Sequence, residues 1–273
     1  MEVGYSFQSL FNILMMMIAS GLGLAVATSL ASKGWKISIA DMNENAGNEA
    51  ATSLKGSFHK TNVNDYASLS STFDKTFKEY GQIDFVFANA GIVERDNFYA
   101  KFPNDGPPPP PEMLSVDIDL KAVIATGYLT QHYMRQNPHQ NGGTLISTSS
   151  VGGIYPAPFC PMYAAAKHGV LGFTRSIAKH FFKHDKIRAN AIMPGTMKTG
   201  LLTEEEWKNF SATEWTPVNK AVEVVEMLLD DSEEHWGKTV EIQGREHFFR
   251  EQPEYPNEAT RRVMEATDIE SLT

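Results

Sequence analysis

Short apolar runs alternate with longer stretches of helix-forming residues along most of the chain. The apolar runs predict strands at 11–18, 37–40, 58–63, 83–88, 143–149, 187–193 and 239–242. The stretches between them predict helices at 21–33, 43–54, 66–80, 112–136, 163–184 and 218–229. Strands that alternate with helices form βαβ units. The pattern therefore predicts an α/β fold with a doubly wound parallel sheet and helices on both faces.

The chain has no internal repeat and no linker that would split it, and its 273 residues suffice for one large domain with a core. We expect a single domain over 1–273, with its core at 11–245 and a C-terminal tail at 246–273. The five prolines Pro107–Pro111 should form a stiff surface segment. The tail is polar with a few aromatics, and we expect it to pack over the domain edge or against a neighbouring subunit.

The net charge and the cysteine content argue against several kinds of partner and location for this protein. The formal net charge of -9 argues against nucleic acid and anionic membranes as partners. The single cysteine, Cys160, excludes an internal disulfide and favours a reducing, cytoplasmic location. The apolar run 10–18 is too short for a membrane span and is interrupted by Asn12, so we interpret it as a buried strand rather than a targeting segment.

Three residues form a candidate set for moving a proton to or from a carbonyl oxygen. Tyr163 is followed four residues later by Lys167, and Ser150 stands thirteen residues upstream of the tyrosine. A tyrosine is a poor base at neutral pH, and a lysine one helical turn away lowers its pKa by favouring the phenolate. A serine hydroxyl can hold the substrate oxygen meanwhile. The Tyr–Lys pair alone is a weak signal, because such a spacing also arises by chance.

A candidate dinucleotide site surrounds this set. Ser20-Gly21-Leu22-Gly23 lies at a strand-to-helix junction, where small residues let the backbone approach a pyrophosphate. Asp41 ends the second predicted strand, where a carboxylate binds an adenosine ribose and repels a 2′-phosphate. Its alternative role is the N-cap of helix 43–54. Asn89-Ala90-Gly91 follows the fourth strand, and its small residues would let a nucleotide lie across the sheet edge.

These motifs, in this order and spacing, resemble the short-chain dehydrogenase/reductase family over about 11–245, including the stretch Tyr163-Ala164-Ala165-Ala166-Lys167. Within the family the chain looks most like hydroxyprostaglandin-dehydrogenase-type members and fungal secondary-metabolite dehydrogenases. The resemblance implies a single dinucleotide-binding and catalytic domain of Rossmann type that uses NAD(P)(H). It places Asn62 and Val63 at the adenine and Asn89–Gly91 along the ribose. It also implies that Lys167 binds the nicotinamide ribose. The residues that it implies would hold the nicotinamide are Pro194, Gly195, Met197 and Thr199.

The chain departs from the family pattern at three places. Met16 and Met17 stand where the phosphate loop has threonine and its first glycine, and a methionine side chain would crowd the pyrophosphate. Either cofactor affinity is reduced, or residues 1–17 come from an altered gene start. Asp119 stands at the position of a catalytic asparagine, where it would continue a proton relay but add charge near Lys167. Asn62 replaces a common aspartate.

The substrate side is apolar in sequence. The segment 151–162 between the serine and the tyrosine carries no charge, which favours an apolar substrate, although it could simply close the core. Segment 198–217 combines aromatic and acidic residues and is the expected lid. Histidines 132, 139, 168, 180 and 184 show no metal-ligand pattern, so no metal site is expected, and His180 and His184 are placed on the surface.

The sequence therefore predicts an oxidoreductase that interconverts a hydrophobic secondary alcohol and ketone. NAD(H) is favoured because of Asp41, with NADP(H) as the alternative, and the substrate would belong to terpenoid, polyketide or steroid-like secondary metabolism. Family resemblance implies a homodimer or homotetramer through helices 112–136 and 163–184. Two alternatives stay open: a cofactor-impaired relative acting as a binding or scaffold protein, and a family member catalysing isomerisation or cyclisation.

Overall fold

The computed structural model describes residues 21–103, 106–138, 142–208, 210–211, 215–230 and 235–268, together with the backbone of 12–16. In this part of the chain, the sheet has eight strands in the order β3-β2-β1-β4-β5-β6-β7-β8. All neighbours pair in parallel except β7 and β8, which are antiparallel. The chain winds outward in both directions from the centre, so the strand order reverses between β1 and β4. Such a reversal opens a crevice at the carboxyl ends of the strands.

The strands are short and mostly buried. Their bounds are β1 Asn12–Met16, β2 Lys36–Asp41, β3 Ser57–Lys60, β4 Phe85–Ala88, β5 Gly143–Thr148, β6 Ile187–Pro194, β7 Thr239–Gln243 and β8 Glu246–Phe249. Every residue of β4 is buried, as are all but one residue in each of β2, β6 and β7 and the four central residues of β5. Continuous burial is expected for parallel strands with helices on both faces. Of these strands, only β4 is an unbroken apolar run, because the others also bury polar residues such as Ser38 and Asn190.

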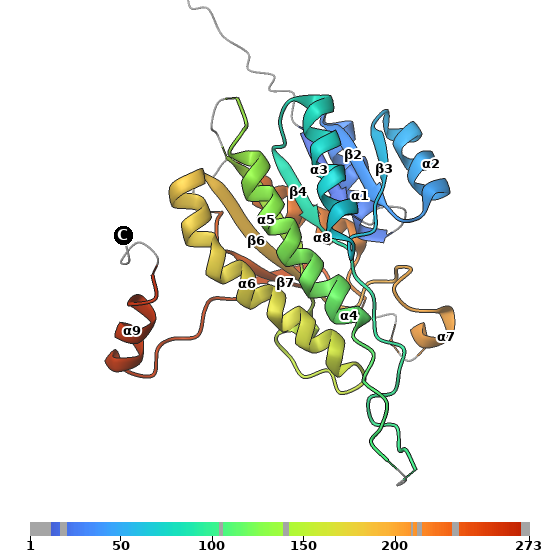
Figure 1. Ribbon diagram of the computed structural model, residues 1–273, viewed down its shortest axis with the longest axis vertical. Helices are drawn as coiled ribbons and strands as arrows, with labels where there is room; N and C mark the ends of the chain where they lie inside the picture. The colour runs from blue at the N-terminus through green and yellow to red at the C-terminus, as the bar shows by residue number, and fades with distance from the viewer. Residues whose placement is uncertain are drawn as a thin grey trace, which may run out of the picture.

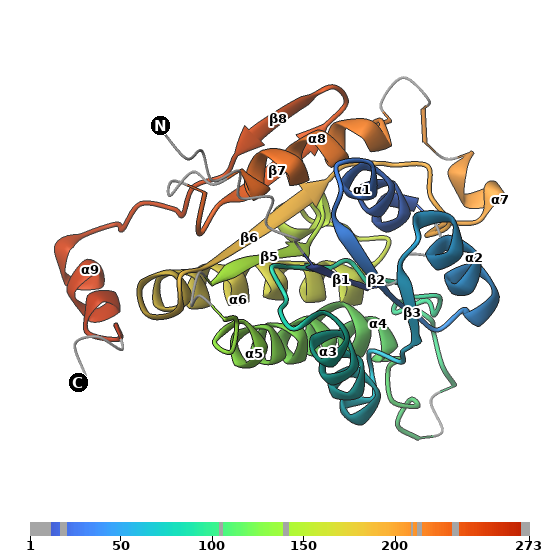
Figure 2. The ribbon, with the colours of Figure 1, turned by 90° about the horizontal axis from the view of Figure 1, so that it is seen from above.

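Helices cover both faces of the sheet (Figures 1 and 2). One face carries α1 Gly21–Ser32, α2 Glu44–Leu54 and α8 Val218–Leu229, which pack on side chains such as Phe85 and Phe87. The other carries α3 Tyr66–Tyr80, α5 Ala122–Met134 and α6 Pro161–Asp185, which pack on Val86 and Leu145. The predicted doubly wound α/β architecture is thereby confirmed.

The predicted helix at 112–136 is interrupted at its start. Its first turn, α4 Leu114–Val116, runs into a π-helical turn, Asp117–Lys121, before α5 begins. A π turn holds one residue more than an α turn and rotates the side chains that follow it. Here it directs Asp119 into the interior, where its side chain is fully buried.

The C-terminal tail differs from the prediction that β7 would be the last strand. β8 extends the sheet edge after the turn at Gly244, whose φ is +57°. The tail then runs to α9 Glu258–Glu265, in which no residue is buried. In Figures 1 and 2, α9 stands apart from the body of the molecule. The tail nevertheless contacts the domain edge through β8 and through an ion pair between Asp268, just after α9, and Lys179 of α6.

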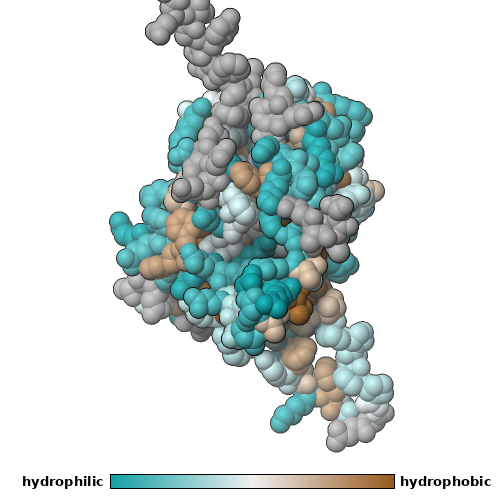
Figure 3. Space-filling view, turned by 90° about the vertical axis from the view of Figure 1, so that its left-hand side faces the viewer, coloured by the Kyte–Doolittle hydropathy of each residue, from teal (hydrophilic) through white to brown (hydrophobic). Residues whose placement is uncertain are grey.

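The loop before α4 projects from the molecule. Figure 3 shows a mainly hydrophilic face, with this projection at its lower end. The loop exposes the large apolar side chains of Phe98, Tyr99 and Phe102. The prolines 107–111 that follow are exposed as predicted. No helix in the described part of the chain is long and apolar enough to cross a membrane.

Candidate active site

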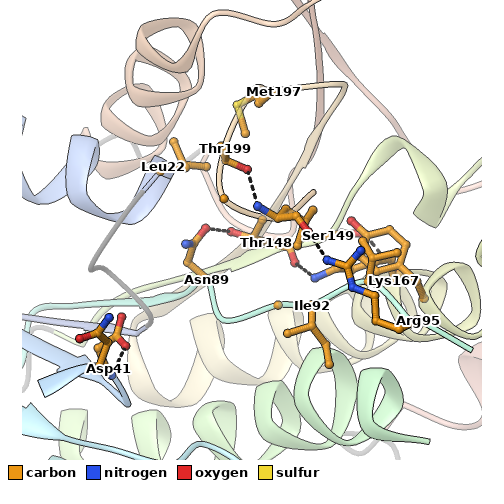
Figure 4. Close-up of a pocket in the computed structure, with 17 residues that line it drawn as sticks. Leu22, Asp41, Asn89, Ile92, Arg95, Thr148, Ser149, Lys167, Met197 and Thr199 are labelled. Carbon is orange, nitrogen blue, oxygen red and sulfur yellow. Dashed lines mark hydrogen bonds between the residues drawn. The ribbon is translucent and has the colours of Figure 1, made fainter. Parts of the chain in front are cut away.

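A cavity of about 530 Å³ lies at the carboxyl ends of the parallel strands, beside the reversal of strand order. Figure 4 shows that its walls come from the start of α1, the end of β2, the segment after β4, the end of β5, α6 and the loop after β6. The sequence predicted seven of its lining residues in the dinucleotide and proton-transfer sets, namely Gly21, Leu22, Asp41, Asn89, Gly91, Tyr163 and Lys167. Met197 and Thr199, predicted by the family resemblance, also line it.

Tyr163 and Lys167 lie one turn apart on α6, and both face this cavity. The Lys167 ammonium is 5.4 Å from the centre of the Tyr163 ring. It donates a hydrogen bond of 3.0 Å to the carbonyl of Thr148 at the end of β5. The lysine thus lies on the same face of α6 as the tyrosine, as the four-residue spacing predicted, and its hydrogen bond joins it to the end of β5.

Ser150 lies next to this pair but is not among the residues that line the cavity. Its hydroxyl accepts a 3.1 Å hydrogen bond from the Gly152 N–H and caps the short turn Val151–Gly153. A side-chain hydrogen bond with Ser150 also favours the phenolate form of Tyr163. The lining on this side comes from Thr148 and Ser149, neither of which the sequence had singled out.

Burial sets the pKa of Tyr163. Enclosure in the protein raises the pKa of the phenol above its usual value, and this effect outweighs all others. The charge of Lys167 and the hydrogen bond with Ser150 lower it, whereas the carboxylate of Asp119 raises it. The predicted influence of Lys167 therefore has the expected direction, but the net pKa of Tyr163 is raised.

Asp119 is tied to both Lys167 and the segment after β4. Its Oδ2 lies 3.2 Å from the Lys167 Nζ, and its Oδ1 accepts a 2.8 Å hydrogen bond from the Ile92 N–H. Burial raises the pKa of this carboxyl, while Lys167 and the Ile92 hydrogen bond lower it. Gly91 passes so close that an added Cβ would lie 3.2 Å from the Lys167 Nζ. A side chain at position 91 would therefore crowd the ion pair.

Two of the residues expected to bind the dinucleotide, Gly21 and Asp41, have a conformation and a position that suit this role. Gly21 begins α1 with a φ of +65°, and an added Cβ would lie 3.3 Å from Thr199. Asp41 is 6% exposed at the end of β2, and its Oδ1 accepts a 2.7 Å hydrogen bond from the Asn43 N–H. Asn43 is the N-cap of α2, accepting from the Ala46 N–H, so the alternative role of Asp41 as that cap is wrong.

Several predicted cofactor residues lie away from the cavity wall. Val63 and Ala90 are buried in the core, and Gly23 is buried within α1. Asn62 is exposed beyond β3. Pro194 ends β6, and Gly195 packs so tightly on β7 that an added Cβ would lie 2.0 Å from the Gln243 side chain. Ser20 and Met17 lie outside the described residues, as does the Met16 side chain. The cofactor roles of these residues stay predictions.

The predicted lid reaches the cavity through its first residues. Thr199, Gly200 and Leu201 line the wall. Sequence reasoning missed that Arg95, on the segment after β4, fastens this loop. Its guanidinium lies 2.5 Å from Glu206 and donates a 3.1 Å hydrogen bond to the Leu201 carbonyl. The two loops are far apart in sequence and no local motif marks their contact.

None of the described residues that line the cavity is a histidine. Among the described residues, no group of three His, Cys, Asp or Glu side chains could hold a metal ion. His180 and His184 lie with ring centres 4.4 Å apart on the C-terminal half of α6. His184 is exposed as expected, whereas His180 is half-buried because its side of the helix turns toward the body.

Comparisons with known proteins agree with this geometry. The family model for short chain dehydrogenases matches residues 12–209. The short-chain dehydrogenase/reductase prx7 of Penicillium rubens is 41% identical over 275 residues, covering 92% of this chain and 97% of that protein. The 15-hydroxyprostaglandin dehydrogenase (NAD+) of Homo sapiens is 33% identical over 196 residues, covering 69% and 68% of the two chains.

Solved structures show the same fold. The crystal structure of levodione reductase superimposes with a TM-score of 0.75 at 28% identity, covering 86% of this chain and 96% of that one. A 3-ketoacyl-(acyl-carrier-protein) reductase from Brucella melitensis, complexed with NADH, reaches a TM-score of 0.73 at 19% identity, covering 86% and 98%.

Proposed function

The chain belongs to the short-chain dehydrogenase/reductase family, and on that premise we propose that it transfers a hydride between NAD(H) and a hydrophobic secondary alcohol or ketone. The observation that carries this proposal is the joint placement of Tyr163, Lys167 and Asp41 on one cavity at the carboxyl edge of the sheet. In this proposal the chain acts as one catalytic unit, with core 11–245 and tail 246–273.

The cavity fits a nicotinamide dinucleotide. Gly21 has a positive φ at the start of a helix, so the backbone can approach a pyrophosphate there. Asp41 would accept hydrogen bonds from the adenosine ribose, Asn89 and Gly91 would lie along the nucleotide, and Met197 and Thr199 would hold the nicotinamide. When bound, the nicotinamide accepts or donates the hydride.

Each side chain around the reacting carbon has a separate role in transferring the proton. Ser150 polarises the substrate oxygen, and Tyr163 removes its proton in oxidation or supplies one in reduction. Lys167 favours the phenolate of Tyr163 and would also bind the nicotinamide ribose. Asp119 positions Lys167 through the buried ion pair and continues the proton relay toward solvent.

The proposed substrate is apolar. The uncharged segment 151–162 lies beside Tyr163, where an added Cβ at Gly152 would lie 3.6 Å from the ring. No residue of this segment lines the cavity, but Leu201 from the lid does. One relative is named as a dehydrogenase of a hydroxyprostaglandin, and two others are fungal short-chain dehydrogenase/reductases. These support a hydrophobic alcohol or ketone of secondary metabolism as substrate. We further propose a homodimer or homotetramer.

A fluorescence titration with NADH, and with NADPH alongside, tests the proposal. The wild type should bind NADH more tightly than NADPH and reduce NAD+ with a panel of apolar secondary alcohols. The double variant Met16→Thr/Met17→Gly serves as the comparison for the phosphate loop. Failure of both proteins to bind either nucleotide would reject a dehydrogenase and favour a binding or scaffold role. Turnover of substrate without net change in NADH would indicate isomerisation or cyclisation.

A further inference from the structure

The segment that follows β4 contacts three separate parts of the candidate active site. Ile92 donates its N–H to Asp119, and Arg95 contacts the lid at Glu206. Between them, the Oε2 of Glu94 accepts a 2.6 Å hydrogen bond from the backbone N–H of Tyr163, a residue 69 positions away. Glu94 is 8% exposed and does not line the cavity of the candidate active site. Its contact with α6 is therefore separate from the cavity wall.

The N-terminus of α6 needs such a partner. The first N–H groups of a helix have no acceptor within it, and a capping side chain usually supplies one. The N-cap residue here, Cys160, makes no side-chain cap, and Pro161 has no N–H to satisfy. Tyr163 is the third residue of the helix, so its N–H is one of the groups left over. The Glu94 carboxylate both accepts this hydrogen bond and places a negative charge at the positive end of the helix dipole.

We propose that Glu94 is a positioning residue, which caps the catalytic helix from a distant loop and thereby fixes the turn that carries Tyr163. Helix ends fray when their N–H groups lack partners, and a frayed first turn would move the tyrosine relative to Lys167. Since Lys167 lies one turn further into the helix and is held by Thr148 and Asp119, the cap acts on the first turn, which carries Tyr163, and not on Lys167. This inference rests on the proposed function for its kinetic consequence, but not for the cap itself.

Kinetics of three variants test the consequence. Glu94→Ala removes the acceptor and should lower kcat about tenfold, the scale of a lost helix cap, while KM for NAD+ stays unchanged. Glu94→Gln keeps an acceptor oxygen and should retain kcat within about threefold of the wild type. Asp96→Asn removes an exposed carboxylate two residues further along and should change neither constant. Equal losses in the Gln and Ala variants would overturn the cap as the cause.

Cys160 gives a readout that needs no activity. It is the single cysteine of the chain and stands at the N-cap of the same helix. Burial and, to a smaller extent, the charge of Glu94 together raise the pKa of its thiol to about 11. Alkylation at a fixed pH of about 8 should accelerate at least about threefold in Glu94→Gln, because more thiolate forms, and further in Glu94→Ala, where the turn loosens. Asp96→Asn should react like the wild type.

The two measurements separate the proposals. If the wild type oxidises no alcohol of the panel but Cys160 reacts faster in Glu94→Ala than in Glu94→Gln, the proposed function fails and the cap stands. If the wild type is active and a folded Glu94→Ala protein matches it in both kcat and thiol reactivity, the cap is overturned. Thermal unfolding of each variant establishes that the compared proteins are folded.

Discussion

The ammonium of Lys167 lies 3.2 Å from the carboxylate of Asp119, and both side chains are enclosed, with exposed fractions of 3% and 0%. The enclosure magnifies the effect of each charge on its neighbours, because little water is present to screen it. Tyr163 feels both charges, with Lys167 lowering its pKa and Asp119 raising it. Asp119 therefore weakens the activation that Lys167 provides.

Asp119→Asn should shift the pH profile of oxidation toward lower pH. Oxidation requires the phenolate of Tyr163, so the rate rises as pH passes the pKa of that phenol. Removing the carboxylate removes an effect that raises this pKa, so the rise should begin at lower pH. The amide can still accept the Ile92 N–H. The measurement is kcat/KM for alcohol oxidation against pH.

Asp117→Asn is the matched control for this shift. Asp117 lies in the same π-helical turn but pairs with Lys121 at the surface. Its removal should leave the profile unchanged. A profile of Asp119→Asn that is unmoved, or moved to higher pH, would contradict the assigned electrostatics.

Tyr163→Phe should abolish most turnover without disturbing the fold. The substitution keeps the ring against Lys167 and removes only the hydroxyl, so general acid–base catalysis is lost and kcat should fall about 10²–10⁴-fold. Tyr66→Phe is the control, since its side chain is exposed at the start of α3 and does not line the cavity. Circular dichroism checks the fold, and steady-state rates check the effect. Full activity in a folded Tyr163→Phe protein would exclude the mechanism.

Local signals in the sequence determined what could be predicted. Helix 66–80 was predicted to its residue bounds because Asp65 caps its start and Gly81, with a φ of 79°, ends it. The spacing of Tyr163 and Lys167 likewise needs only one helix. β8 escaped prediction because its four residues alternate poorly and become a strand only by pairing with β7.

Contacts between distant segments could not be predicted in the same way. Arg95 and Glu206 are 111 residues apart, and Glu94 and Tyr163 are 69 apart. The sequence shows only charged residues in loops at these positions, which are usually solvated. The π-helical turn at Asp119 could not be predicted either, for a different reason. Its apolar residues are spaced almost as they would be in an uninterrupted α-helix, and sequence periodicity does not resolve the difference.

Asp41→Ala should relax the preference for NAD(H) over NADP(H). The carboxylate stands at the end of β2, where it would bind the ribose hydroxyls and repel a 2′-phosphate. Its loss should weaken NADH binding and strengthen NADPH binding, which the ratio of the two dissociation constants measures. Asp65→Ala is a suitable control, because that carboxylate only caps α3. Tighter binding of NADPH than NADH by the wild type would contradict this role of Asp41.

Arg95→Ala should loosen the lid and raise KM for the substrate. The guanidinium joins the segment after β4 to Glu206 and to the Leu201 carbonyl, so its removal frees the loop that lines the cavity. The pair is partly exposed, with side-chain exposures of 54% and 28%, and such pairs contribute modestly. We therefore expect a rise in KM of about two- to fivefold with little change in kcat. In the wild type, KM should rise with salt, because screening weakens the pair.

The charge state of this pair should not change over the working pH range. A hydrogen bond from the Thr203 backbone, followed by the contact with Arg95, lowers the pKa of Glu206 to about 2. A carboxyl with a lowered pKa contributes stability above its unfolded value of 4.5 and loses that contribution as pH falls toward 2. The Arg95→Ala effect on KM should thus be constant between about pH 6 and pH 9. Lys208→Ala, which breaks an exposed pair with Glu205 on the same short helix, should leave KM unchanged. An equal rise in both variants would show that the lid responds to surface charge in general rather than to the Arg95 contact.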